Sequence, residues 1–344
     1  MADRLGIGLI GLGMAVKPHA LALKDLGAEV DFVGGFSPTP QRREGFEKTY
    51  GLPTVGSLDE LLSDSRVDAV IILTPPRSHA ELTIAAAKAG KHVLLEKPLD
   101  VTFAQACDIV DAVDQTKRKL GVVFQFRFRE AVMTLRELLR AGELGDLLSV
   151  SCAVRWWRPP EYFAQPGRGM LDRDGGGVLL TQAIHTLDVL LDLAGPVERV
   201  SAQCRTSPLR SIDTEDIACA SVEYVSGAIG VIDATTVAYP GFPERIEIAG
   251  SKGSAVLEAE RLVVHCNGKE PFQLEGSMEG GGGADPMAYS HEPHRRLIED
   301  FVTAVRNGEE PRASGRSALP VHALIDGMLE SSRREQPVRI ETRK

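Results

Sequence analysis

Short apolar runs alternate with helix-like segments throughout the first third of the chain. The apolar runs cover 5–10, 29–36, 69–73, 92–95 and 121–124, and the helix-like segments between them cover 15–26, 40–50, 57–63, 78–89 and 102–117. Apolar strands that are separated by helices form a parallel sheet with helices on both faces. This alternation therefore predicts an N-terminal α/β domain built on a doubly wound parallel sheet.

The pattern changes after residue 126. Strand-like alternation then covers 148–157, 197–206, 216–224, 228–235, 244–249 and 253–258, and helices are expected at 131–141, 179–193, 291–306 and 317–333. Strands joined by short turns are typical of a mostly antiparallel sheet. A chain of 344 residues is long enough for two domains. We therefore expect one domain over 1–125 and a second α/β domain over 126–344.

Composition excludes several classes of protein. The net charge is -9 and no basic tract is interleaved with aromatic residues, so nucleic acid is not an expected partner. No apolar run approaches the ~20 residues that span a bilayer, and the N-terminus lacks the pattern of a signal peptide. The five cysteines form no Cys-x-x-Cys pair, which argues against structural zinc and against a disulfide framework. We therefore expect a cytoplasmic protein that binds no metal and no membrane.

A glycine turn follows the first predicted strand. Gly11 and Gly13, with Met14 and Ala15 behind them, open the first predicted helix. Glycines at such a turn let the backbone approach a pyrophosphate, which binds at the helix N-terminus. Val16 replaces the third glycine of the full fingerprint. The position favours a dinucleotide-binding Rossmann domain, and the alternative is a glycine-rich turn in another α/β protein.

The end of the second predicted strand bears on the choice of dinucleotide. A carboxylate is expected there to bind the ribose 2′-hydroxyl of NAD, but this chain has Ser37, with Arg42 and Arg43 close behind. Arginines without a carboxylate suit the 2′-phosphate of NADP. We therefore expect NADP to be accepted at least as well as NAD. The alternative is that both arginines are ordinary surface residues of a helix.

Two more segments lie where predicted strands end. Thr74, Pro75 and Pro76 follow the third strand, with His79 starting the next helix, and Glu96, Lys97 and Pro98 follow the fourth. Ligands bind at the carboxyl ends of strands in open α/β sheets. Lys97 can stabilise an alkoxide or donate to a carbonyl while hydride moves. The alternatives are prolines that only break a strand and a surface lysine in a salt bridge.

The predicted helix over 179–193 carries a polar stripe beside its apolar one. Thr181, His185 and Asp188 recur at helical spacing, so Asp188 is placed to orient the His185 ring. This arrangement suits a general acid/base. The alternative is a histidine that only caps or packs.

Taken together, these motifs resemble the Gfo/Idh/MocA oxidoreductase family over nearly the whole chain. The resemblance implies that Lys97 and His185 are the catalytic pair and that Gln125 and Arg127 lie near nicotinamide and substrate. It also implies an open sheet in the second domain, packed between subunits of a homodimer or homotetramer. The chain departs from the family pattern at Pro76, often asparagine, and at Thr181, often aspartate. Thr181 and Gln182 are closest to a branch similar to sugar-nucleotide dehydrogenases.

A segment rich in arginine and aromatic residues covers 155–163, and it too is similar to that branch. Aromatic rings bind sugar faces and arginines bind carboxylates or phosphates, so Arg158, Tyr162 and Arg168 are candidate substrate contacts. Packing at a subunit interface is the alternative.

The sequence as a whole predicts an NAD(P)-dependent oxidoreductase acting on a secondary alcohol or ketone of a sugar, polyol, sugar acid or related small molecule. We expect the cofactor to contact Gly11, Gly13, Met14, Ala15, Ser37, Arg42, Thr74, Pro75, Pro76, His79, Glu96, Lys97 and Gln125. We expect the substrate to contact Arg127, Arg158, Tyr162, Arg168, Thr181 and Gln182. The alternatives are a non-catalytic dinucleotide-binding regulator and an enzyme with a closed redox cycle.

Overall fold

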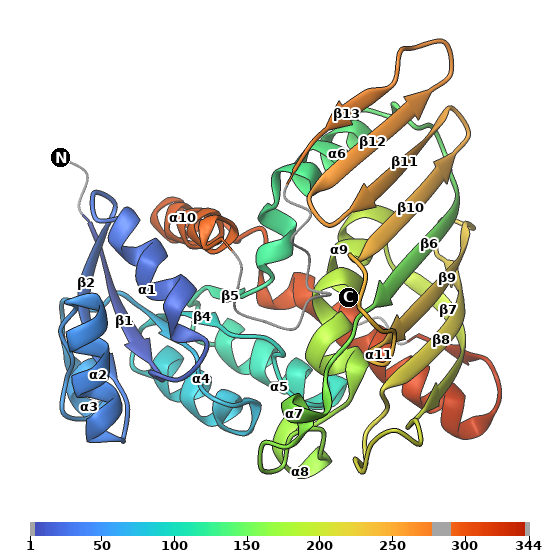
Figure 1. The fold of residues 1–344 in the computed structure, drawn as a ribbon. Coiled ribbons are helices and arrows are strands. Elements are labelled where there is room, and N and C mark those ends of the chain that lie inside the picture. The colour runs from blue at the N-terminus through green and yellow to red at the C-terminus, as the bar shows by residue number, and fades with distance from the viewer. Residues whose placement is uncertain (1–3, 277–289, 341–344) are drawn as a thin grey trace. The chain divides into compact units, whose positions relative to one another are not determined.

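The computed structural model describes residues 4–276 and 290–340. The chain divides into two compact units, one of residues 1–125 with 290–319 and one of residues 126–289 with 320–344. Figure 1 shows both as ribbons. The first segment of the first unit ends at residue 125. The return of residues 290–319 to the first unit was not expected.

The first unit is built on a five-stranded sheet whose strands are all parallel. In spatial order the strands are β2 (Val30–Phe36), β1 (Leu5–Ile10), β3 (Ala69–Ile72), β4 (His92–Leu95) and β5 (Leu120–Val122). Every residue of β1 and β3 is buried, because helices cover both faces. The helices are α1 (Val16–Asp25), α2 (Pro40–Tyr50), α3 (Leu58–Ser63), α4 (His79–Lys88) and α5 (Phe103–Asp114). The predicted doubly wound α/β domain is confirmed.

A sixth helix of this unit comes from the C-terminal part of the chain. It is α10 (Glu292–Asn307), which packs beside α1 (Figure 1). Its apolar face is buried, and Phe301 lies so close to β5 that a Cβ on Gly121 would stand 2.9 Å from its ring. Downstream, the Val122 amide donates to the Ala313 carbonyl at 2.7 Å. The amphipathic pattern predicts this helix but cannot say which sheet its apolar face covers.

The second unit is built on a nine-stranded sheet. In spatial order the strands are β13 (Phe272–Leu274), β12 (Arg261–Cys266), β11 (Gly253–Glu258), β10 (Arg245–Gly250), β6 (Leu147–Arg155), β9 (Ile229–Thr235), β8 (Ile217–Tyr224), β7 (Val197–Arg205) and β14 (Val338–Arg339). Neighbouring strands are antiparallel except β6 and β9, which are parallel. The mostly antiparallel sheet that the sequence predicts is confirmed.

Residues alternate between a buried and an exposed face along the strands of this sheet, as β8 shows. Helices α6 (Glu130–Arg140) and α9 (Ile184–Ala194) contact strands of the sheet, and shorter helices α7 (Pro160–Phe163) and α8 (Leu171–Asp174) precede α9. The boundary between the units falls at Pro320, inside α11 (Gly315–Arg334). The stretch Leu171–Ala194 is long and apolar enough to span a membrane, but 72% of its most apolar window is buried, as in a core helix.

Candidate active site

The glycine turn after β1 has the geometry that a phosphate-binding loop needs. Gly11 has φ +100°, and a Cβ there would lie 2.9 Å from the backbone of Leu73. Both its backbone conformation and its close packing therefore require glycine. A Cβ on Gly13 would meet only Nη1 of Arg42, at 4.0 Å. The backbone at Gly13 is thus open to a ligand.

The N-terminus of α1 follows this turn and suits an anion. Among the described residues, no side chain caps its first turn and no acidic residue lies in that turn. Amide groups at such an end bind phosphate, and the helix dipole favours negative charge. Met14 is 66% exposed beside it. The turn and helix therefore fit the pyrophosphate of a dinucleotide.

Two arginines in the first turn of α2, just after β2, have different roles. Nη1 of Arg43 donates to the carbonyl of the buried Ser37 at 2.5 Å, which holds the loop in place. Arg42 is exposed and reaches over the glycine turn toward Gly13. Arg42 is consequently the arginine available to a cofactor phosphate.

The loops that follow β3 and β4 are held together by His79. Its ring is fully buried, with Nδ1 2.8 Å from the Pro98 carbonyl oxygen and Nε2 2.8 Å from the Thr74 carbonyl oxygen. The hydroxyl of Ser78 donates to Oγ1 of Thr74 at 2.8 Å. The structure therefore makes His79 a support for the two loops, while Pro75 is exposed and Pro76 half-buried in the loop after β3.

Glu96 points into the first unit, although the sequence placed it among the cofactor contacts. Its Oε1 lies 3.0 Å from Nε2 of His19 on α1, and its Oε2 accepts the Lys97 amide at 3.1 Å. Burial alone would raise the pKa of Glu96, but the hydrogen bond from His19 and nearby positive charge hold it below its ordinary value. The carboxylate is therefore ionised, and Lys97 follows it half-buried at the end of β4.

His294 of α10 completes this cluster. Its ring packs edge-on against His19, with centroids 5.0 Å apart. Burial, reinforced by the charge of His19, lowers the pKa of His294 to about 3, so its imidazole is neutral at neutral pH. The ligand-type atoms of His19, Glu96 and His294 lie within 4.8 Å of one another. Ligands of a tetrahedral zinc stand about 3.4 Å apart, and His19 already contacts Glu96 at hydrogen-bond distance, so we interpret the cluster as a hydrogen-bonded unit.

Gln125 is the last residue in the first segment of the first unit, and its side-chain oxygen is a hydrogen-bond acceptor. Its Oε1 is buried and has no hydrogen-bond partner within residues 4–276 and 290–340. Such an acceptor needs a donor when the site is filled. An amide group of the size of the nicotinamide carboxamide would supply one, so Gln125 also fits the cofactor.

In the second unit, His185 is the second residue of α9, which directly follows a π-helical turn, Leu179–Ala183. The ring of Phe126 stacks on its imidazole at 4.8 Å. Helical spacing predicted that Asp188 would orient His185. In the structure Asp188 accepts two hydrogen bonds from Arg127, at 2.7 and 2.5 Å, and both side chains are at most 4% exposed. Arg127, an expected substrate contact, is therefore engaged in supporting α9.

The other expected substrate residues of the second unit lie together. Nε2 of Gln182 donates to the Tyr162 hydroxyl at 3.2 Å, and Oγ1 of Thr181 lies 2.5 Å from Oε1 of Gln182. The guanidinium groups of Arg168 and Arg158 stand 5.0 and 5.8 Å from the centre of the Tyr162 ring. Five residues that the sequence proposed thus form one polar and aromatic cluster.

Glu215 supports this cluster and was missed by the sequence analysis. Its carboxylate accepts the Leu179 amide at 3.0 Å, at the start of the π-helical turn. A Cβ on Gly177 would lie 1.9 Å from the Glu215 carbonyl oxygen, which explains glycine at that position. Burial raises the pKa of Glu215. No local pattern reveals such a contact, because the partners are 36 residues apart.

Comparison with known proteins agrees with both units. Residues 5–124 match the model described as an oxidoreductase family with an NAD-binding Rossmann fold, and residues 132–256 match the GFO/IDH/MocA C-terminal domain. An inositol 2-dehydrogenase of Rhizobium meliloti is 29% identical over 97% of this chain and 98% of its own length. An uncharacterized oxidoreductase of Synechocystis is 33% identical over 94% of this chain and 93% of its own length.

Solved structures show the same architecture. The WlbA dehydrogenase of Bordetella pertussis, in complex with NADH and UDP-GlcNAcA, has a TM-score of 0.82 and 28% identity, covering 98% of this chain and 99% of that one. A levoglucosan dehydrogenase in complex with NADH and levoglucosan has a TM-score of 0.87 at 24% identity, covering 98% and 100%. At that identity the second likeness concerns the fold alone.

Proposed function

The chain belongs to the Gfo/Idh/MocA oxidoreductase family, and from that premise we propose that it is an NAD(P)-dependent dehydrogenase of a sugar, polyol or sugar acid. Relatives over its whole length are named dehydrogenases of inositol and levoglucosan. The observation that carries the proposal is Lys97 at the carboxyl end of β4, with the glycine turn following β1 of the same parallel sheet. Carboxyl ends of parallel strands share one edge, where ligands bind.

We assign the acid/base work to Lys97 and His185. When bound, the nicotinamide supplies the hydride acceptor or donor. In the oxidative direction His185 takes the hydroxyl proton, and the ammonium of Lys97 stabilises the developing alkoxide. Stacking of His185 on Phe126 and the support of α9 by Arg127 restrict the motion of the imidazole.

The test is turnover by Lys97→Ala on a panel of polyols, sugars and sugar acids, with NADH binding followed by fluorescence. We expect ~100-fold or greater loss of kcat with NADH affinity retained. Full turnover by this variant would refute the role of Lys97. NADH binding by the wild type without turnover of any substrate would favour a regulator. Turnover without steady-state release of reduced cofactor would favour a closed redox cycle.

For the cofactor, we propose that NADP is accepted at least as well as NAD. The support is the absence of a carboxylate among residues 37–40, directly after β2, together with the position of Arg42 over the glycine turn. Relatives point to NAD, since a Bacillus subtilis relative is named for NAD(+) and the WlbA complex holds NADH. Measuring kcat/KM with each cofactor tests the proposal. Arg42→Ala should lower kcat/KM for NADP and leave kcat/KM for NAD unchanged.

For the substrate, we propose contacts from Arg158, Tyr162, Arg168, Thr181 and Gln182. Two arginines beside one aromatic ring suit a sugar that carries a carboxylate or a phosphate. WlbA, whose complex holds a UDP-sugar acid, is a precedent for an anionic substrate. Higher kcat/KM for sugar acids than for their neutral counterparts is the expected result.

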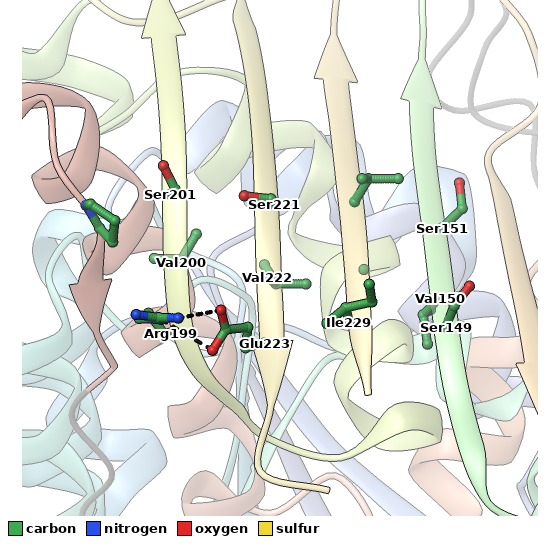
Figure 2. A pocket seen from close by; sticks show the side chains of 13 residues that line it. Ser149, Val150, Ser151, Arg199, Val200, Ser201, Ser221, Val222, Glu223 and Ile229 are labelled. Atoms are coloured by element: carbon green, nitrogen blue, oxygen red, sulfur yellow. Dashed lines mark hydrogen bonds and ion pairs between the residues drawn. The ribbon is translucent and has the colours of Figure 1, made fainter. Parts of the chain in front are cut away.

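We also propose that the protein is a cytoplasmic homodimer or homotetramer. The support for location is that all five cysteines are free. The support for assembly is a pocket on the outer face of the nine-stranded sheet, and Figure 2 shows the side chains that line it. Small serines line this pocket beside Ile229 and Val231, which are 61% and 54% exposed. Light scattering coupled to size exclusion tests this proposal.

A further inference from the structure

We propose that Glu96, anchored by His19, is a positioning residue that fixes Lys97 and carries a negative charge next to it in the chain. The inference rests on the proposed function, because it concerns the residue to which that function assigns the alkoxide. The inference goes beyond the proposed function because it explains how residues of the first unit hold Lys97 in place.

The first observation is that both oxygens of Glu96 are engaged by different elements. Oε1 lies 3.0 Å from Nε2 of His19, and Oε2 accepts the backbone amide of Lys97 at 3.1 Å. The side chain of Glu96 is only 15% exposed. A side chain with two partners cannot rotate without losing one of them. The backbone of Lys97 is therefore tied to helix α1.

The second observation is that, within residues 4–276 and 290–340, His19 has no hydrogen-bond partner other than Glu96. Its ring is fully buried, and Nδ1 has no hydrogen-bond partner in the described part of the chain. Burying a polar atom without a partner is unfavourable. The contact with Glu96 is the polar interaction that offsets this cost. His294, which is neutral, covers the other side of the ring edge-on.

The third observation is electrostatic. The titratable groups around Glu96 are His19 on α1, His294 on α10 and Lys97 itself, and the charge of Lys97 favours the ionised carboxylate. The attraction between the two charges is mutual. Oxidised nicotinamide adds positive charge, and the Glu96 carboxylate offsets it.

The anchor also links the two ligand-binding loops. His19 lies on α1, whose N-terminus follows the glycine turn, while Glu96 precedes Lys97 at the end of β4. Because one hydrogen bond joins these elements, movement of the phosphate-binding helix is transmitted to the Lys97 loop. Precise placement matters, since a displacement of about 1 Å can cost ~100-fold in rate.

The experiment compares Glu96→Gln with wild type across pH. Glutamine keeps the shape and an acceptor for His19 but removes the charge. We expect NADH affinity within about twofold, kcat lower by roughly 10- to 100-fold, and the limb of the pH–rate profile that reports Lys97 shifted to lower pH. The matched control is Glu81→Gln, which removes a charge from an exposed site of α4 and should leave both kcat and the profile unchanged.

A wild-type profile and kcat in Glu96→Gln would overturn the inference. If that variant does not fold, His19→Asn tests the anchor alone: we expect lower kcat with an unshifted profile, because the carboxylate remains, and wild-type kcat would again overturn it. Lys97→Ala separates the two proposals. Full turnover by Lys97→Ala refutes the proposed function, whereas impaired Lys97→Ala beside wild-type-like Glu96→Gln refutes only the positioning role.

Discussion

The two sheets of this protein bury their residues in different ways, and their functional residues differ accordingly. In the parallel sheet both faces are covered, as the fully buried β1 and β3 show. Only the strand ends are left for chemistry, and Lys97 follows one of them. In the nine-stranded sheet every second residue of β8 faces outward. There the candidate residues lie on α9 and on the segment before it, and alternate residues of β8 are exposed on the outer face.

The largest effect on stability should come from the ion pair that supports α9. Removing one partner of a buried pair leaves an uncompensated charge, so Asp188→Asn should lower the free energy of unfolding by about 3–5 kcal/mol. Urea titration measures it. The control is Glu223→Gln, which breaks the half-exposed pair with Arg199 (Figure 2) and should cost less than about 1 kcal/mol. Equal losses in both variants would contradict the importance of the buried pair.

Shortening one side chain in each sheet tests whether the parallel sheet is buried on both faces and the nine-stranded sheet on one. Ile71 of β3 is fully buried, so Ile71→Ala should cost about 2–4 kcal/mol. Val231 of β9 is 54% exposed, so Val231→Ala should cost less than about 0.5 kcal/mol in a monomer. A larger loss at Val231 that shrinks on dilution would show that the outer face is covered by a second subunit. A small loss at Ile71 would contradict the two-sided burial of the parallel sheet.

A smaller, pH-dependent effect distinguishes the units through one buried histidine each. Burial is the main cause that lowers the pKa of His294 to about 3 and of His322 to about 4. A histidine that stays neutral in the folded state gives stability that is full above its unfolded pKa of about 6.5 and is lost as pH falls below it. The loss continues to about pH 3 for His294 and to about pH 4 for His322.

Unfolding in urea at pH 7 and pH 5 measures this loss, which we expect to be about 1 kcal/mol or more per histidine. The variants His294→Gln and His322→Gln should each flatten the pH dependence of their own unit. An unchanged slope in either variant would contradict the burial of that imidazole in its neutral form.

The strands, most helices and the strand-end motifs were predictable because they depend on local periodicity and on residue type. The glycine turn and the Glu96-Lys97-Pro98 segment fall where their sequence positions indicate. The direction of a side chain was not predictable in the same way. Glu96 faces His19, 77 residues away, and Asp188 faces Arg127, 61 residues away. Helical spacing brought Asp188 near His185, but a bidentate guanidinium from outside the helix is the stronger partner.

The return of residues 290–319 to the first unit has a practical consequence for domain exchange. A fragment that ends at residue 125 lacks α10, so it would expose the buried faces of α1 and β5 and leave His19 uncovered. A chimera that borrows a relative's cofactor domain through one junction would therefore carry a mismatched helix. Three junctions, near residues 125, 290 and 320, are needed to move the module intact.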